Sequence, residues 1–137
     1  MNGEALQQAI YSKLSGDAEL MAMIRGVYAV VDQADDSGSD AAFPYVTIGR
    51  DSIVPWDTKT SFGAEAICQI DVWSRAGNYL EAKGIASAIS NALHHQPLTI
   101  AGCSHVMTVE QSSAFMKDPD GTTKRGMLLF KVSYVRA

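Results

Sequence analysis

Three histidines have the widest chemical scope in this sequence, because imidazole can bind metals or transfer protons near neutral pH. His94 and His95 are adjacent at the end of a predicted helix, where neighbouring side chains point about 100° apart, and no cysteine or carboxylate has the spacing of a zinc site. His105 is alone in a predicted strand. These patterns favour a surface helix end and a hydrogen-bonded or exposed histidine over a metal site.

The acidic residues suggest two further kinds of site. The segment Asp118–Gly121 resembles the start of a calcium-binding loop, but the fifth, sixth and twelfth positions hold threonine, threonine and leucine instead of the required ligands and glycine. Its proline and glycine predict a turn that joins two strands. Glu65 and Asp71 alternate on the polar side of a predicted strand. We interpret them as solvated charges rather than as a catalytic pair.

The sequence contains no Gly-x-x-x-x-Gly-Lys-Ser/Thr, Gly-x-Ser-x-Gly or Cys-x-x-Cys motif. No catalytic, cofactor-binding or metal-binding residues are therefore predicted. We expect a protein that is not an enzyme and needs no cofactor.

The composition is that of an ordinary globular protein, with 137 residues, 47% hydrophobic and 19% charged. This length predicts a single domain, residues 1–137. A net charge of −4 argues against a nucleic-acid-binding surface. The apolar runs are too short to cross a membrane, and the start of the chain lacks a signal-peptide pattern, which predicts synthesis in the cytoplasm. Cys68 and Cys103 stand among apolar residues and are interpreted as small buried hydrophobic residues.

The strongest structural signal is the stretch from Gly63 to His94. Its first part alternates small or apolar residues with polar ones, as in a strand with one buried face. After residue 77 the period becomes helical, with an apolar stripe made of Ala82, Ile85, Ala86, Ile89, Ala92 and Leu93. Asn78 stands at the expected N-cap, and Glu81 is placed to complete a capping box. Pro97 follows the helix end.

Before this unit, the sequence predicts a first helix with Leu6, Ala9, Ile10 and Leu14 on one face, then a short helix over 18–24 capped by Asp17. Short strands are predicted over 27–31 and 45–50. An acidic stretch, residues 32–42, is predicted to be a mobile loop. Residues 51–62, with Pro55, are predicted to be a projecting loop.

After the helix, the sequence predicts a short strand over 98–100, a longer one over 104–115, and a projecting turn over 117–125. The last strand places Leu128, Phe130, Val132 and Tyr134 on one face. Antiparallel strands with two main helices predict an α+β fold, a small antiparallel sheet with the helices packed on one or both of its faces.

Large apolar residues interrupt the polar face of the central strand. They are Ile67 and Trp73, and the segment that leads into the strand adds Trp56 and Phe62. Either a second helix covers this face or part of it is buried against another subunit.

Four short segments stand in a set order along the chain: Phe43–Gly49, Pro55–Lys59, Val72–Gly77 before the main helix, and Asp118–Gly121 before the last strand. In this order and spacing they resemble the tail-completion or tail-terminator family of long-tailed bacteriophages and related prophage particles. The resemblance covers nearly the whole chain.

The resemblance implies a virion structural protein that forms a ring, typically of six subunits, at the head-proximal end of the tail tube. The ring ends tube polymerisation and offers a surface to the head connector or head-completion protein, and DNA only passes through its lumen, with no membrane partner. The alternative is another head–tail joining or tube component, with a small-molecule binder or enzyme as a further alternative. A ring requires two different patches on each subunit. The residues predicted to make these contacts are Trp56, Asp57, Lys59, Phe62, Ile67, Trp73, Lys117, Lys124 and Arg125.

Overall fold

The computed structural model describes residues 3–28, 44–57, 62–75, 77–117, 119 and 123–136. Its helices and strands are α1 (Gly3–Ser15), α2 (Ala18–Met21), β1 (Val27–Tyr28), β2 (Tyr45–Asp57), β3 (Phe62–Ser74), α4 (Leu80–Leu93), β4 (Cys103–Lys117) and β5 (Lys124–Arg136). The strands form one five-stranded sheet in the order β1-β2-β3-β5-β4. The predicted acidic loop over 32–42 and Lys59 lie outside the described residues.

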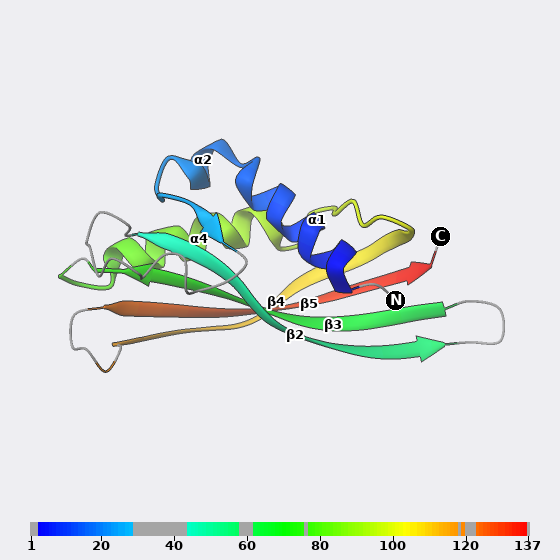
Figure 1. The fold of residues 1–137 in the computed structure, drawn as a ribbon. Coiled ribbons are helices and arrows are strands. Elements are labelled where there is room, and N and C mark those ends of the chain that lie inside the picture. Colours follow the sequence, from blue (N-terminus) through cyan, green and yellow to red (C-terminus); the bar gives the residue numbers. More distant parts are fainter. Residues whose placement is uncertain are drawn as a thin grey trace.

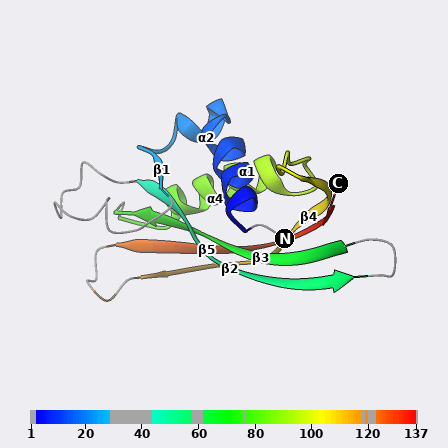
Figure 2. The ribbon, with the colours of Figure 1, turned by 45° about the vertical axis from the view of Figure 1, so that its right-hand side comes forward.

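The helices α1, α2 and α4 lie on the same side of the sheet (Figures 1 and 2). The predicted α+β class is confirmed, with one correction to the sheet, because β1 runs parallel to β2. A parallel neighbour needs a connection much longer than a hairpin turn, and the long stretch between Tyr28 and Tyr45 provides the length. The other strand pairs are antiparallel.

The core lies between the helices and the sheet, where the predicted apolar stripes of both helices are buried. On the sheet, alternate residues of β3 and β5 complete it, from Ala64 to Val72 and from Leu128 to Tyr134. The short helix ends at Met21, and the Asp17 carboxylate caps it by accepting a hydrogen bond from the Leu20 N–H at 3.1 Å. The period of each segment therefore decided which of its faces became core.

The start of α4 differs from the predicted capping box. Asn78 Oδ1 accepts a hydrogen bond from the Leu80 N–H at 2.9 Å, but the Glu81 carboxylate accepts one from Ser74 Oγ at 2.6 Å. Ser74 is fully buried at the end of β3. A buried hydroxyl without a partner is costly, so Glu81 is used to join the helix to the sheet.

The prediction of a loop over 51–62 was wrong for residues 51–57, which continue β2, and for Phe62, which begins β3. Pro55 suggested a loop because proline cannot donate a backbone hydrogen bond. It is tolerated here because β1 pairs only with Val46 and Thr47, which leaves this half of β2 at an edge of the sheet among the described residues. The predicted short strand over 98–100 is also absent, although Leu98 and Ile100 are buried.

Candidate assembly surfaces

The face of the sheet opposite the helices carries two pairs of opposite charges. Arg125 Nη2 lies 3.1 Å from the Asp71 carboxylate, and Lys131 Nζ lies 3.9 Å from that of Glu65. The prediction that Asp71 is solvated was wrong, because this residue is only 5% exposed. Gln69 Nε2 donates to both of its carboxylate oxygens, at 3.1 and 3.2 Å. A carboxylate paired and hydrogen-bonded in this way can be removed from water.

Beside this pair, aromatic side chains pack on one another. The Trp73 ring stacks on Tyr45 with centroids 6.2 Å apart, and its indole N–H donates to Thr47 Oγ1 at 3.0 Å. Tyr28 meets Tyr45 edge to face, and the Arg125 guanidinium lies 5.0 Å from the Trp73 ring centre. Trp73 is therefore held by its own chain at this end of the sheet.

At the other end of the sheet, two aromatic residues lie on opposite faces. Trp56 pairs with Gly63 and is 39% exposed on the helix-free face. Its ring covers Gly63 so closely that a Cβ added there would lie 2.6 Å from it, which explains the glycine. Phe62, 47% exposed, follows the alternation of Ala64 on the other face, and the Arg136 guanidinium lies 4.7 Å from its ring centre.

Ile67 lies on the helix-free face between Ser52 of β2 and Lys131 of β5. The sequence left open whether a helix covers this face. None of the described helices does, since all of them lie on the opposite side (Figure 1). Ile67 is half-buried by its neighbours in the sheet.

Apart from Ile67, the described residues of the predicted contact set lie at two opposite ends of the sheet. Asp57 and Phe62 pair at the β2–β3 end, next to Trp56. Lys117 pairs with Lys124 at the β4–β5 end, where Arg125 also lies. Lys124 is buried, whereas Lys117 is exposed. The two groups cannot form one site, although each remains a predicted contact region.

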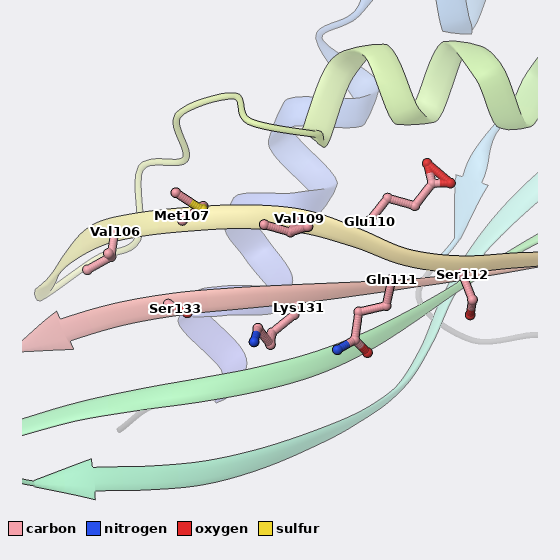
Figure 3. Close-up of a pocket in the computed structure, with 8 residues that line it drawn as sticks. All are labelled: Val106, Met107, Val109, Glu110, Gln111, Ser112, Lys131 and Ser133. Carbon is pink, nitrogen blue, oxygen red and sulfur yellow. The ribbon is translucent and has the colours of Figure 1, made fainter.

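Strand β4 has features that the sequence did not predict. It is interrupted by irregularities between His105 and Met107 and between Glu110 and Ser112. At the second, Glu110 points toward α4 while Gln111 and Ser112 point to the other side, beside an open hollow of about 740 Å³ (Figure 3). Val106 and Met107, both exposed, line the same hollow. The weak alternation of this segment was the only signal in the sequence, and it did not reveal the bulges.

Part of the β4 edge is covered by the segment that follows α4. The Glu110 N–H donates to His94 Nδ1 at 3.0 Å, and the His95 N–H donates to the Thr108 carbonyl at 2.8 Å. No described strand pairs with the outer edge of β4 over residues 111–117, or with the outer edge of β2 over 51–57. These two open edges lie at diagonally opposite corners of the sheet.

The rings of His94 and His105 make hydrogen bonds within the chain, whereas the His95 ring stacks on that of His94. His105, predicted to be hydrogen-bonded or exposed, is hydrogen-bonded to Thr108 Oγ1 at 2.7 Å. Among the described residues, no three histidine, cysteine or carboxylate groups are gathered as metal ligands. No helix in that part of the chain is long and apolar enough to span a membrane.

Two solved structures share this arrangement. A chain from the virion of a native gene transfer agent particle aligns with 96% of this chain and 95% of its own length, with a TM-score of 0.83 and 27% identity. The structure of the bacteriophage SPP1 gp17 protein aligns with 94% of this chain and 88% of its own, with a TM-score of 0.58 and 30% identity. The chain thus shares its fold with a chain of a virion particle and with a bacteriophage protein.

The sequence comparisons identify the family. Residues 8–134 match the family model described as tail completion protein gp17. The tail completion protein gp17 of Bacillus phage SPP1 is 33% identical over 124 residues, which cover 90% of this chain and 87% of that protein. This chain belongs to the tail completion protein gp17 family.

Proposed function

We propose that this protein forms a ring, typically of six subunits, that caps the head-proximal end of a tail tube, ends its polymerisation and provides the surface to which the head joins. Membership of the tail completion family supports a role in the tail. The main observation that supports a ring is the presence of two unlike open edges on one sheet, one on β2 and one on β4.

A closed ring needs heterologous contacts, in which one patch of a subunit meets a different patch of the next. Each strand from β2 to β4 in the sheet is antiparallel to its neighbour, so β2 and β4 run in opposite directions. Rotation about a ring axis leaves unchanged the direction in which each strand runs along that axis. The β2 edge of one subunit therefore meets the β4 edge of the next as an antiparallel pair, a hydrogen-bonding pattern that closes the sheet across the boundary.

The diagonal placement of the two edges also favours a ring over a flat ribbon. β1 covers β2 at Val46 and Thr47, and the chain after α4 covers β4 at residues 108–110. If the open part of β2 pairs with the open part of β4 in the next subunit, each subunit is shifted along the strand direction relative to its neighbour. Closed barrels require such a stagger, because their strands are tilted to the axis.

Pro55 lies within the open part of β2 and removes one donor from it. Edges that carry proline and bulges resist uncontrolled pairing. We expect isolated subunits to associate weakly and the ring to form on the tube. The tube protein, the head connector or head-completion protein, and further copies of this chain are its proposed partners, and DNA passes through the lumen.

The two groups of contact residues suit different partners because they lie at opposite ends of the strands. The β2–β3 end presents the exposed aromatic rings of Trp56 and Phe62. The other end presents cationic residues around the β4–β5 hairpin, including Lys117. In a ring whose tilted strands run from one face of the ring to the other, one end of the sheet faces the tube and the other end faces the head.

The test replaces Val54 by lysine in the assembling particle and measures tail length by electron microscopy. Val54 is 59% exposed on the open edge of β2. Leu80→Lys, at a residue 75% exposed on α4, is the matched control because it makes the same change away from both edges. We expect overlong or headless tails with Val54→Lys and normal tails with Leu80→Lys.

Deletion of the protein provides the second arm. Overlong or headless tails support termination, whereas normal, head-bearing tails contradict it. Self-polymerisation of the purified protein into tubes would indicate a tube component instead. A monomer in isolation does not contradict the proposal unless rings are also absent when tail tube is added.

A further inference from the structure

The segment from His94 to Leu98 lies along the edge of β4 and joins it through two imidazole rings. His94 Nδ1 accepts the Glu110 N–H at 3.0 Å, and His105 Nδ1 accepts the Leu98 N–H at 3.4 Å. Between them, the His95 N–H donates to the Thr108 carbonyl at 2.8 Å. We call residues 94–98 the edge strap, since they occupy hydrogen-bonding groups of β4 that would otherwise be open to another strand.

Both imidazoles must be neutral to make these bonds. A neutral ring has one donor nitrogen and one acceptor nitrogen, whereas a protonated ring has two donors. Because Nδ1 is the acceptor in both residues, Nε2 carries the proton, and that of His105 donates to Thr108 Oγ1 at 2.7 Å. A second proton on either ring places a donor against a backbone N–H.

We propose that the edge strap is a histidine latch, closed while His94 and His105 are neutral, whose protonation in mild acid frees the β4 edge over residues 108–110 while the rest of the sheet stays folded. The function of this latch rests on the proposed ring, because a freed β4 edge enlarges the surface available to a neighbouring subunit. The latch itself is a property of the single chain.

The titratable groups around the latch come from three elements. Glu110 lies on β4, and its carboxylate accepts a hydrogen bond from Ser90 Oγ at 2.6 Å, one helical turn before His94. His95, in the strap, stacks on His94 with ring centres 4.0 Å apart. Tyr134 on β5 pairs with His105, and burial raises the pKa of its hydroxyl, which keeps it neutral.

The electrostatics of His105 agree with a neutral ring. Burial lowers its pKa from 6.5, against a smaller opposing effect of a hydrogen bond with the Met107 backbone. A histidine whose pKa is lower in the folded state stabilises the fold fully above its unfolded pKa of about 6.5, and this stability is lost as the pH falls through the folded value.

The test follows amide hydrogen exchange of the isolated chain from about pH 7.5 to about pH 5, corrected for the intrinsic pH dependence of exchange. We expect protection of the Glu110 and Leu98 amides to fall about tenfold, the factor for one net hydrogen bond of about 1.4 kcal/mol, while that of Ile70 in β3 stays constant. A fall shared equally by Ile70 indicates global unfolding and overturns the latch. Constant protection at all three amides overturns it too.

Two variants sharpen the result. His94→Asn keeps an acceptor near the position of Nδ1 but cannot titrate, so we expect protection of Glu110 to become independent of pH. His95→Asn is the matched control, because His95 has a φ of 58°, which asparagine tolerates, and its ring accepts none of the backbone bonds described above. If His95→Asn abolishes the pH dependence and His94→Asn does not, the latch is wrong.

A third readout needs no substitution. Nitrogen-15 spectra of the imidazole rings distinguish the two neutral tautomers, and we expect both His94 and His105 to carry their proton on Nε2 near pH 7.5. Protonation of Nδ1 in either ring contradicts the latch. These measurements use the single chain, so their failure leaves the ring untouched, and normal tail length in the deletion experiment leaves the latch intact.

Discussion

On the helix-covered face of the sheet, Ile70, Leu128 and Phe130 are shielded from water by whole helices. On the opposite face, Asp71 and Tyr45 are also almost inaccessible, and among the described residues side chains of the sheet pack against both. Non-directional apolar burial stabilises the first face, and directional pairing of charges and rings stabilises the second. Low exposure on the helix-free face therefore depends on individual partners, so single substitutions there should act through those partners.

The largest expected effect is on the helix-covered face. Phe130→Ala removes a fully buried ring, and we expect the free energy of unfolding to fall by about 3–5 kcal/mol, measured by urea denaturation. Leu129→Ala, at the next residue on the opposite face, is the control and should cost about 1 kcal/mol because Leu129 is only half-buried. Equal losses would remove the distinction between the faces.

Next in size is the buried charge pair. Asp71→Asn leaves the Arg125 guanidinium, already with an unpartnered buried Nε, without its opposite charge. We expect the free energy of unfolding to fall by about 2 kcal/mol. This is below the range for fully buried pairs because Arg125 is partly exposed. Glu65→Gln makes the same change in the exposed pair with Lys131 and should alter stability by less than about 0.5 kcal/mol. A similar loss in both variants would contradict the role of burial.

Gly63→Ala tests the contact between β3 and the Trp56 ring. The new Cβ forces the ring to move, and we expect the free energy of unfolding to fall by about 1 kcal/mol. Fluorescence during unfolding measures this loss and should also show a shift of tryptophan emission. Gly84→Ala is the control, because an added Cβ there meets nothing within 4 Å and should stabilise α4 by about 0.5–1 kcal/mol. Unchanged emission in Gly63→Ala would show that the ring does not rest on Gly63.

The smallest expected effect concerns Cys68 on the helix-covered face. Burial, with a smaller contribution from Asp51, raises its pKa from 9.0 to about 12. The folded protein therefore keeps this thiol protonated while the unfolded chain ionises, so stability falls as the pH rises above 9.0. At pH 8, a thiol reagent should label the half-buried Cys103 faster than Cys68, and both after unfolding. Equal labelling of the folded chain contradicts this.

How much could be predicted from the sequence depends on how local the signal is. The apolar stripe of α4 and the alternation of β5 follow from the period of each segment, and both were correct. The Asp118–Gly121 segment also correctly suggested that two strands are joined there, because β4 and β5 pair on either side of it. The prediction of a loop over 51–57 failed because Pro55 is compatible with either a loop or an edge strand. Only the position of β2 in the sheet distinguishes the two.

The α+β class and the buried face of each main element follow from the sequence because they depend on the periodicity within each segment. The resemblance to tail completion proteins follows from the order and spacing of short segments along the chain. Only the tertiary structure decided that Asp71 is buried, that the two hairpins lie at opposite ends of the sheet, and that His94 and His105 hold the edge of β4. Each of these depends on strand register or on contacts between segments far apart in sequence, and a one-residue slip of register would reverse the face of every side chain involved.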